Sequence, residues 1–272
     1  MSGSKSTINA YVSGGQDHDS TIRSLTHWAY ENPSQGNDEE FGNLWILWDA
    51  FNAVAQRKPE AQDMLVQLMA DIKALPPPMR NGVPLRCWGG ELWKDLPIAG
   101  PNMRESWNFF EPEIDEPDRE ERRRHWVNLN AFAARLTRTG VLNFDLYVIW
   151  AMRSALEGEC DDDGLDTAVT AAAQWIFIAG EHIYQSERQY PTAPNTGDPA
   201  CGGPLWTGQR GFCEERWILW RERFEDMSDA KFWDVVATDF EEKQRASELF
   251  IRAPQVAAEA AAKMAAIEAA AK

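Results

Sequence analysis

The sequence predicts an all-α fold, and three observations lead to that prediction. Apolar residues recur at intervals of three and four along most of the 272-residue chain, as they do on one face of a helix. Prolines stand at expected helix starts, at Pro59 and Pro117, and Gly140 stands at an expected helix end. Residues 166–186 are apolar nearly all round, which is typical of a central buried helix. We therefore expect a single globular bundle of about 8–10 helices with long loops rich in proline, glycine and tryptophan.

The composition narrows the classes of partner. The chain carries 27 Lys and Arg against 43 Asp and Glu, a formal charge of -16, which would repel nucleic acid and anionic membrane surfaces. At 44% hydrophobic and 26% charged residues the composition is that of a globular protein, and 13 tryptophans exceed ordinary usage. We expect no nucleic-acid partner and no membrane partner.

The N-terminal residues 1–19 are polar and rich in Gly and Ser, without the apolar core of a secretory signal, so a flexible arm is expected there. The longest apolar runs fall far short of the roughly 18 residues that suggest a membrane span. The four cysteines have no C-x-x-C spacing, which favours a reducing compartment and a cytoplasmic location. They are Cys87, Cys160, Cys201 and Cys213.

The first two helices are expected over residues 40–55 and 59–75, where the apolar positions keep the helical interval. Three consecutive prolines from Pro76 stop the second helix. Residues 76–116 then carry prolines and glycines at a density that predicts a long irregular excursion. A loop of this length inside a domain is usually functional or held by its own aromatic anchors.

Three helices are expected in the middle of the chain, over residues 117–140, 143–157 and 166–186. The first turns of 117–140 are acidic, which suits the positive end of the helix dipole. The helix at 166–186 is expected to form the architectural core because it has no polar face to expose.

Two further helices are expected over residues 212–226 and 229–250, after a connection rich in proline and glycine at 191–211. Ser228 is placed to cap the second of them. The tetrapeptide W-I-L-W occurs at 45–48 and again at 217–220. One match does not establish a repeat, because repeat proteins show three or more copies.

The C-terminal residues 254–272 predict an Ala-rich helix. Glu259 with Lys263, and Glu268 with Lys272, have the i,i+4 spacing that supports a solvated helix. Its narrow apolar stripe is expected to pack on a partner chain or to project into solvent, so a homodimer is one expectation. Residues 20–253 remain as the all-α domain.

An acidic motif, D-D-x-x-D, is formed by Asp162, Asp163 and Asp166. In that pattern clustered carboxylates hold magnesium for a diphosphate-bearing substrate. Here Gly158 and Gly164 place the motif in a connection, so a solvated acidic turn with an N-cap aspartate is the favoured interpretation.

His182 lies on the apolar helix beside Glu181, where a neutral imidazole could act as an acid or a base. A core histidine with satisfied hydrogen bonds fits the same evidence and is favoured. The other histidines have no companions at ligand spacing and H-E-x-x-H does not occur, so we expect no metal and no cofactor.

The tryptophans are the most informative feature of the composition. Each indole buries a large area yet carries an N–H that needs an acceptor, so some commonly line a polar cavity or an interface. Most must belong to the core. An aromatic-walled pocket among helices would suit an apolar small molecule.

Several segments resemble a fungal family of unknown function that is labelled oxopyrrolidine-biosynthesis-associated. They are residues 92–97 (LWKDLP), 126–136 (WVNLNAFAARL), 175–180 (WIFIAG) and 203–206 (GPLW) with Arg216-Trp217. The similarity runs over most of residues 40–250. The resemblance implies a fungal, intracellular, all-α protein with a role in natural-product assembly, and it supplies no catalytic signature.

The leading hypothesis is a cofactor-independent cyclase, pericyclase or isomerase of secondary metabolism that acts on an apolar small molecule. Such catalysis works by shape and preorganised hydrogen bonds and needs neither a nucleophile nor a metal. The expected catalytic residues, which would orient the substrate, are Arg135, His182, Arg216 and Asn130. The expected substrate-binding walls are Trp93, Trp150, Trp175 and Trp206.

Two alternatives remain open. One is a non-catalytic helical scaffold or interaction protein, with the W-I-L-W helices and the Ala-rich tail used for self-association. The other is a magnesium-dependent terpene-type cyclase, which depends on residues 162–166 facing a pocket.

Overall fold

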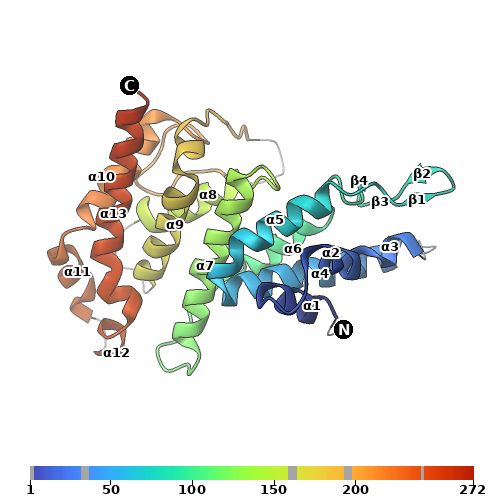
Figure 1. Cartoon of the computed structure of the whole chain (residues 1–272). Helices are drawn as coiled ribbons and strands as arrows, with labels where there is room; N and C mark the ends of the chain where they lie inside the picture. Colours follow the sequence, from blue (N-terminus) through green and yellow to red (C-terminus); the bar gives the residue numbers. More distant parts are fainter. Residues whose placement is uncertain (1–2, 32–36, 159–163, 193–197, 240–241) are drawn as a thin grey trace. The chain divides into compact units, whose positions relative to one another are not determined.

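The structure, a computed structural model, confirms an all-α fold with only very short strands. It describes residues 3–31, 37–158, 164–192, 198–239 and 242–272. The chain divides into two compact units, residues 1–110 and 111–272, which we call unit 1 and unit 2 (Figure 1). The boundary at residue 110 lies inside the excursion expected at 76–116, which the sequence predicts to be a loop within a single domain.

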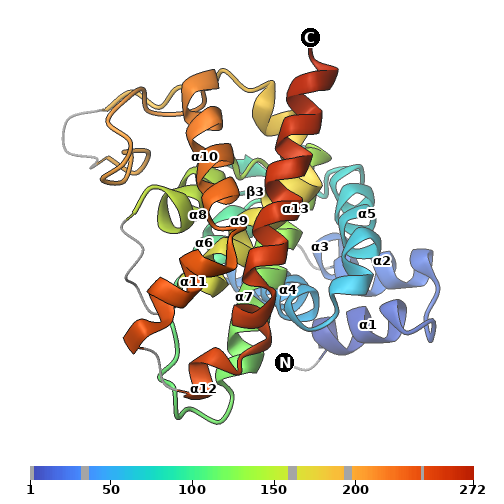
Figure 2. The same cartoon turned by 90° about the vertical axis from the view of Figure 1, so that its left-hand side faces the viewer.

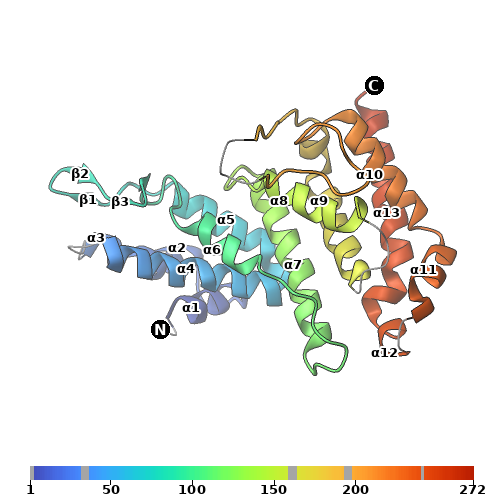
Figure 3. The ribbon, with the colours of Figure 1, turned by 180° about the vertical axis from the view of Figure 1, so that it is seen from behind.

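Unit 1 combines helices with two short antiparallel hairpins. Its helices are α1 (Gly3–Val12), α2 (His18–Thr26), α3 (Trp28–Glu31), α4 (Asn37–Arg57), the 3-10 turn η1 (Pro59–Ala61), α5 (Gln62–Lys73) and α6 (Ala99–Ser106). Its hairpins pair β1 (Met79–Arg80) with β2 (Val83–Pro84) and β3 (Arg86–Cys87) with β4 (Gly90–Glu91). The two hairpins follow α5 and lie at one end of the unit (Figure 3). The long helix α4 packs against α1, α5 and α6 and so forms the centre of unit 1.

The flexible arm expected over residues 1–19 is wrong for the part that the structure describes. Residues 3–12 form α1, and Ile8 is fully buried where α1 packs against α4. Asp17 then caps α2, since its side chain accepts a hydrogen bond of 2.9 Å from the backbone N–H of Ser20. A polar sequence forms helices here because the narrow apolar face of α1 is covered by a neighbouring helix.

Aromatic anchors hold the excursion at 76–116, as the sequence predicts. Trp93 is fully buried and Trp107 is nearly so. From α4, Trp48 donates its indole N–H to the carbonyl of Pro97 at 2.9 Å. The segment between β4 and α6 includes the left-handed residues Trp93 and Ile98, so tertiary contacts fix a backbone that local preference disfavours.

Unit 2 consists of helices arranged around α9. They are α7 (Arg119–Arg138), α8 (Asp145–Leu156), α9 (Leu165–Tyr184), α10 (Glu214–Asp226), α11 (Ala230–Val236), η2 (Ala237–Asp239), α12 (Glu242–Arg245) and α13 (Glu248–Ala270). The core position predicted for residues 166–186 is confirmed, because α9 packs against α7, α8 and α13. The backbone of α9 is kinked at Ala179, whose φ of -122° and ψ of 15° are not helical.

The C-terminal part of unit 2 differs from the prediction in two ways. The single helix expected over 229–250 is interrupted and becomes α11, η2 and α12, and a new helix begins at Glu248. The Ala-rich tail belongs to that new helix, α13, which runs beside α9 and α10 (Figure 2). Its apolar stripe, including Ala260 and Met264, is buried within the same unit rather than left for a second chain. Self-association therefore stays a prediction, and the apolar stripe of α13 is not available as its interface.

Candidate functional site

A histidine and an aspartate from different helices of unit 2 form a hydrogen-bonded pair. His182 lies in the last turn of α9, and Asp145 is the first residue of α8. The Nε2 atom of His182 lies 2.9 Å from Oδ1 of Asp145. The side chain of Asp145 is 6% exposed, whereas that of His182 is 38% exposed. The pair therefore joins a buried carboxylate to an imidazole that reaches the surface.

The second oxygen of Asp145 is also held. Oδ2 accepts hydrogen bonds from the side-chain amide of Asn143 at 2.9 Å and from Nη1 of Arg188 at 3.2 Å. Burial works against the charged carboxylate, but the hydrogen bonds from His182, Asn143 and Arg188 outweigh it and lower the pKa of Asp145. Asp145 is thus an ionised, fixed acceptor.

This geometry determines the tautomer of His182. An ionised carboxylate can only accept hydrogen bonds, so Nε2 of the histidine carries the proton that points to Asp145. In the neutral imidazole the lone pair then lies on Nδ1. Within the described part of the chain no group is hydrogen-bonded to that Nδ1 atom. A buried acid that orients a histidine in this way is the arrangement used in general acid–base catalysis.

The imidazole lines a pocket of about 350 Å3 at the kink of α9. The other lining residues are Arg138, Phe177, Ile178, Ala179, Gly180, Glu181, Gln185 and Lys263. They come from the end of α7, the last turns of α9 and the middle of α13. The pocket is open, and its lining combines apolar side chains with the charged groups of Arg138, Glu181 and Lys263.

Arg216, an expected catalytic residue, is fully buried in a polar cluster. Its Nε and Nη2 atoms donate to the two oxygens of Glu157 at 2.7 and 3.0 Å. Glu157 also accepts from the indole of Trp220 at 2.7 Å and from the backbone N–H of Gly203 at 2.9 Å. The guanidinium stacks over Trp206, 5.7 Å from the ring centroid. These contacts explain the burial of Arg216 as a tie between α10, the end of α8 and the 203–211 loop.

Asn130 and Trp175 also meet in the core. The indole N–H of Trp175, on α9, donates to Oδ1 of Asn130, on α7, at 2.9 Å, and both side chains are fully buried. Arg135 lies further along α7, is half-buried, and donates to the carbonyl of Ala131 at 3.3 Å. None of these three side chains lines the pocket at His182.

The remaining expected wall residues do not form one pocket wall. Trp150, on α8, donates to the carbonyl of Pro199 at 2.7 Å, and Trp206 donates to that of Gln209 at 2.9 Å. Both tryptophans thus anchor loops of unit 2. Trp93 belongs to unit 1, where its ring lies 5.8 Å from that of Trp28.

Two other tryptophans, which the sequence analysis does not single out as wall residues, line a second pocket. Trp217 and Trp220 contribute to a space of about 230 Å3 at the start of α10, together with Tyr184 and Phe212. The thiol of Cys213 lies in the same pocket, and burial raises its pKa, which keeps it protonated and unreactive near neutral pH.

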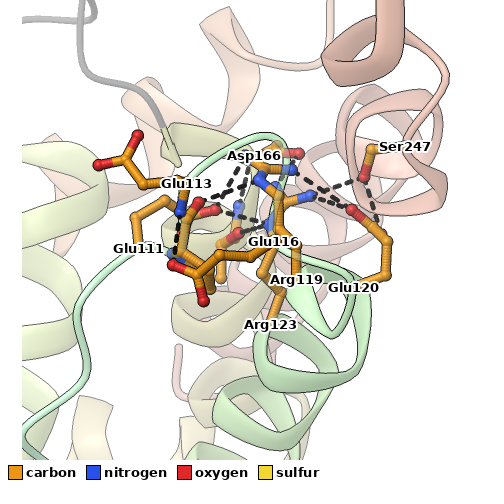
Figure 4. Close-up of polar contacts among 10 residues, drawn as sticks. Glu111, Glu113, Glu116, Arg119, Glu120, Arg123, Asp166 and Ser247 are labelled. Carbon is orange, nitrogen blue, oxygen red and sulfur yellow. Dashed lines mark hydrogen bonds and ion pairs between the residues drawn. The ribbon is translucent and has the colours of Figure 1, made fainter.

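A buried cluster of ion pairs lies at the other end of α9, and Figure 4 shows it. Arg123 is fully buried and pairs with Asp166, with Glu111 at 2.8 Å and with Glu120 at 3.0 Å. Burial opposes the charge on Arg123, but these carboxylates outweigh it and raise the pKa of the guanidinium. Ser247, just before α13, accepts from Arg123 at 2.7 Å. The cluster ties the start of α7, α9 and α13 together, and it has the character of a structural clamp.

The interpretation of residues 162–166 as a solvated turn with an N-cap aspartate is wrong for Asp166, which belongs to this cluster. Asp162 and Asp163 lie outside the described residues, as does Cys160. The N-cap of α9 is Gly164, not an aspartate, and it has a φ of 92°. A Cβ atom at Gly164 would lie 2.8 Å from a carboxylate oxygen of Glu111. Asp166 is buried against Arg123 rather than solvated, so it is engaged by a cation of the protein itself.

Sequence reasoning found His182 but missed Asp145, Asn143 and Arg188. Only one local signal was available. An asparagine two residues before Asp145 accepts the backbone N–H of that aspartate at 3.1 Å, which is a turn typical of a helix start. The partnership with His182 joins positions 37 residues apart, so no short motif contains it.

The described residues show neither a metal site nor a membrane-spanning helix. They contain no group of three or more His, Cys, Asp or Glu side chains placed to hold a metal ion. No helix among them is long and apolar enough to cross a membrane. Cys87, Cys201 and Cys213 are free thiols.

Comparison with known proteins identifies a family but no activity. Residues 48–224 match the family described as protein of unknown function DUF3632. No curated protein and no solved structure matches the chain significantly. The match spans more than half of the chain, which therefore belongs to that family.

Proposed function

We propose that this protein is a cofactor-independent isomerase or cyclase that acts on a small molecule, with His182 as its acid–base residue. The observation that carries the proposal is the 2.9 Å contact between His182 and the buried, ionised Asp145 at the edge of a pocket. The reaction class was a hypothesis of the sequence analysis, and the pair supplies a residue able to perform it. A place in secondary metabolism is part of the proposal and rests on the resemblance at residues 126–136 and 175–180.

The chemistry follows from the tautomer. Nδ1 of His182 would take a proton from a carbon next to a carbonyl group, and the C–H electron pair would move to the carbonyl oxygen as an enolate. The imidazolium would be stabilised by Asp145, and it would return the same proton to another carbon of the substrate. The net result is an isomer, or a ring if the enolate carbon attacks a second carbonyl before proton return. No redox partner is needed.

Asp145 is a positioning residue in this scheme. It fixes the ring and the tautomer of His182 without touching the substrate, and Arg188 and Asn143 fix Asp145 in turn. The other residues expected from the sequence, Asn130, Arg135 and Arg216 with the four tryptophans, are not part of the proposed reaction centre.

Solvent-exchange measurements test the proposal without knowledge of the natural substrate. The protein would be incubated in D2O with a panel of 2-oxo acids, 3-oxo acids and their methyl esters. Proton NMR would follow deuterium entry at the carbons next to the carbonyl, relative to a protein-free blank. We expect exchange above the blank for at least one member with the wild type and none with His182→Gln.

The chain offers a matched control in His18→Gln, because His18 also pairs with an aspartate, Asp71, at 2.8 Å in unit 1. That variant should retain wild-type exchange. Equal exchange by His182→Gln and the wild type, or no exchange with any member of the panel, would overturn the proposal.

A further inference from the structure

The pocket at His182 continues along α13 into a second hollow of about 330 Å3. The two hollows share the lining residues Glu181, Gln185 and Lys263, so they form one groove between the end of α9 and α13. The first hollow holds the imidazole and most of the charged groups. The second is lined mainly by Ala266, Ile267, Ala270 and Ala271 of α13, with Tyr184 of α9. The groove is therefore polar at one end and largely apolar at the other.

We infer that the substrate of this groove is a carbonyl compound with a single negative charge and an apolar tail. The inference rests on the proposed function, whose reaction centre lies at the polar end. It adds the substrate class, which neither the family nor the reaction chemistry specifies.

The charge of the substrate follows from the groups at the polar end. Arg138 and Lys263 both line the first hollow, and neither has a hydrogen-bonding or ion-pair partner among the described residues. Both side chains are exposed, and two cations at one pocket favour an anion there. Glu181 lines the same hollow, so two cations face one carboxylate. That balance suits a monoanion such as a carboxylate or an enolate, and it disfavours a phosphate with two charges.

Because Asp145 already engages His182 and Arg188, the charge on a bound anion must be balanced by Arg138 and Lys263. The carboxylate of Asp145 already holds His182 and Arg188, so neither of them is left to neutralise a second anion at full strength. An enolate formed beside Nδ1 of His182 needs a positive charge close by, and Arg138 and Lys263 are the cations that line the same hollow. The same two residues would bind the anionic substrate and stabilise the enolate.

The tail site follows from the close approach of the two helices. A Cβ atom at Gly180 would lie 2.7 Å from Cδ1 of Ile267, so α13 packs closely against α9 at this glycine. Gly180 follows directly after the kink at Ala179. Beside this contact the exposed face of α13 carries alanines, which leave room that longer side chains would fill. The second hollow, of about 330 Å3, leaves room for a short alkyl tail.

Calorimetric titration with simple carboxylates tests the inference on the full chain. The probes are butyrate, hexanoate and octanoate, with octanamide as the uncharged match of the longest. We expect the affinity to rise roughly twofold to fourfold with each added methylene as the tail enters the apolar hollow. Octanamide should bind at least about tenfold more weakly than octanoate, because it gains nothing from a charged pair.

Two sets of variants locate the site. The double variant Arg138→Gln with Lys263→Gln should weaken octanoate binding about tenfold or more and leave octanamide unchanged. A control with the same loss of charge, Lys231→Gln with Arg252→Gln, removes two exposed cations away from the groove and should bind octanoate as the wild type does. Ala266→Glu should weaken octanoate much more than butyrate, since it places a charge beside the tail only.

The outcomes separate this inference from the proposed function. His182→Gln should still bind octanoate, although it no longer catalyses deuterium exchange. Octanoate binding that does not depend on chain length, or that the Arg138/Lys263 variant retains in full, would overturn the substrate class. Exchange that is as fast with methyl esters as with the free acids would also overturn it while leaving the acid–base role of His182 intact.

Discussion

Among the described residues each unit holds one histidine whose Nε2 is hydrogen-bonded to an aspartate, and the two pairs differ in the burial of the acid and in the partner of the second ring nitrogen. In unit 1, Nε2 of His18 lies 2.8 Å from Asp71, and Nδ1 lies 2.9 Å from the hydroxyl of Tyr11. In unit 2, Nε2 of His182 lies 2.9 Å from Asp145, and no described group bonds to Nδ1. The first histidine uses both ring nitrogens to join α1, α2 and α5, whereas the second keeps one nitrogen for a ligand.

The aspartates differ as well. The side chain of Asp71 is 38% exposed, and that of Asp145 is 6% exposed. Water weakens the first hydrogen-bonded pair, while the second is shielded and its carboxylate is supported by two further donors. A His–Asp distance therefore says little about function. The burial of the acid and the state of the other ring nitrogen distinguish a structural tie from a reactive centre.

The largest expected effect is on catalysis. If it were not observed, the contrast between the two histidines would be wrong. His182→Gln should lower deuterium exchange by about 10²–10⁴-fold, because general acid–base catalysis contributes about that much. His18→Gln should leave the exchange rate unchanged. Glutamine can still donate to either aspartate, so both variants should fold, and circular dichroism would check that they do. A loss of exchange in the His18 variant would mean that the two pairs do not differ as described.

The largest expected effect on the free energy of unfolding comes from the buried ion pair of Arg216 and Glu157. Arg216 and Glu157 are both fully buried, so Arg216→Met should destabilise the fold by about 3–5 kcal/mol by leaving the carboxylate without its cation. Urea unfolding followed by tryptophan fluorescence measures the effect. Arg252→Met is the control, since Arg252 and Glu248 are largely exposed and 3.7 Å apart. That control should cost less than about 1 kcal/mol.

The pH dependence of stability sharpens the contrast between the aspartates. The pKa of Asp145 is lowered in the folded protein, so its ionised form stabilises the fold above the unfolded-state pKa of about 3.9. This contribution is lost as the pH falls through the folded-state pKa. The unfolding free energy of Asp145→Asn should therefore lie below that of the wild type at neutral pH, and the two should converge below about pH 4.

Asp71→Asn is the matched substitution for that experiment. It should produce a smaller difference at neutral pH, because the pair with His18 is half-exposed and screened by solvent. A difference for Asp145→Asn that stays the same from about pH 7 down to about pH 3 would show that the carboxylate charge is not what stabilises the start of α8.

The smallest expected effect concerns Tyr11. Burial, and then the nearby charge of Asp71, raise the pKa of its phenol, so the hydroxyl stays protonated and able to bond to His18. Tyr11→Phe removes that hydrogen bond and should destabilise unit 1 by about 0.5–1.5 kcal/mol. Hydrogen exchange at the amides of α1 and α2 would detect it. No change in exchange would mean that Nδ1 of His18 is as open as that of His182.

The fold could be predicted where apolar residues recur at the helical interval. The candidate site could not be predicted in this way. The core position of α9 follows from an apolar surface that needs burial on every side. The helices at 3–26 are polar and short, so their stability depends on neighbours that the sequence does not specify. The change from α11 to the 3-10 helix η2 at Ala237 has no proline or glycine to predict it.

The same limit applies to the reaction centre. The sequence indicated His182 because histidine is rare on an apolar helix. Asp145 could not be paired with it, since which helix ends meet depends on how α8 and α9 cross. The composition favoured tryptophans that line a pocket. In the structure the indole N–H of Trp175 donates to a core acceptor and that of Trp206 to a loop carbonyl.

The clamp around Arg123 also bears on how the chain folds as it is synthesised. Ser247 lies 124 positions after its partner Arg123, close to the C-terminal end. A contact of that span imposes a large loop-closure cost, and it cannot form until Ser247 has emerged from the ribosome. Until then Arg123 lacks one of its acceptors, and the face of α9 that α13 covers is exposed to water. Unit 2 therefore stays incomplete during synthesis until the segment that begins at Ser247 can pack against α9.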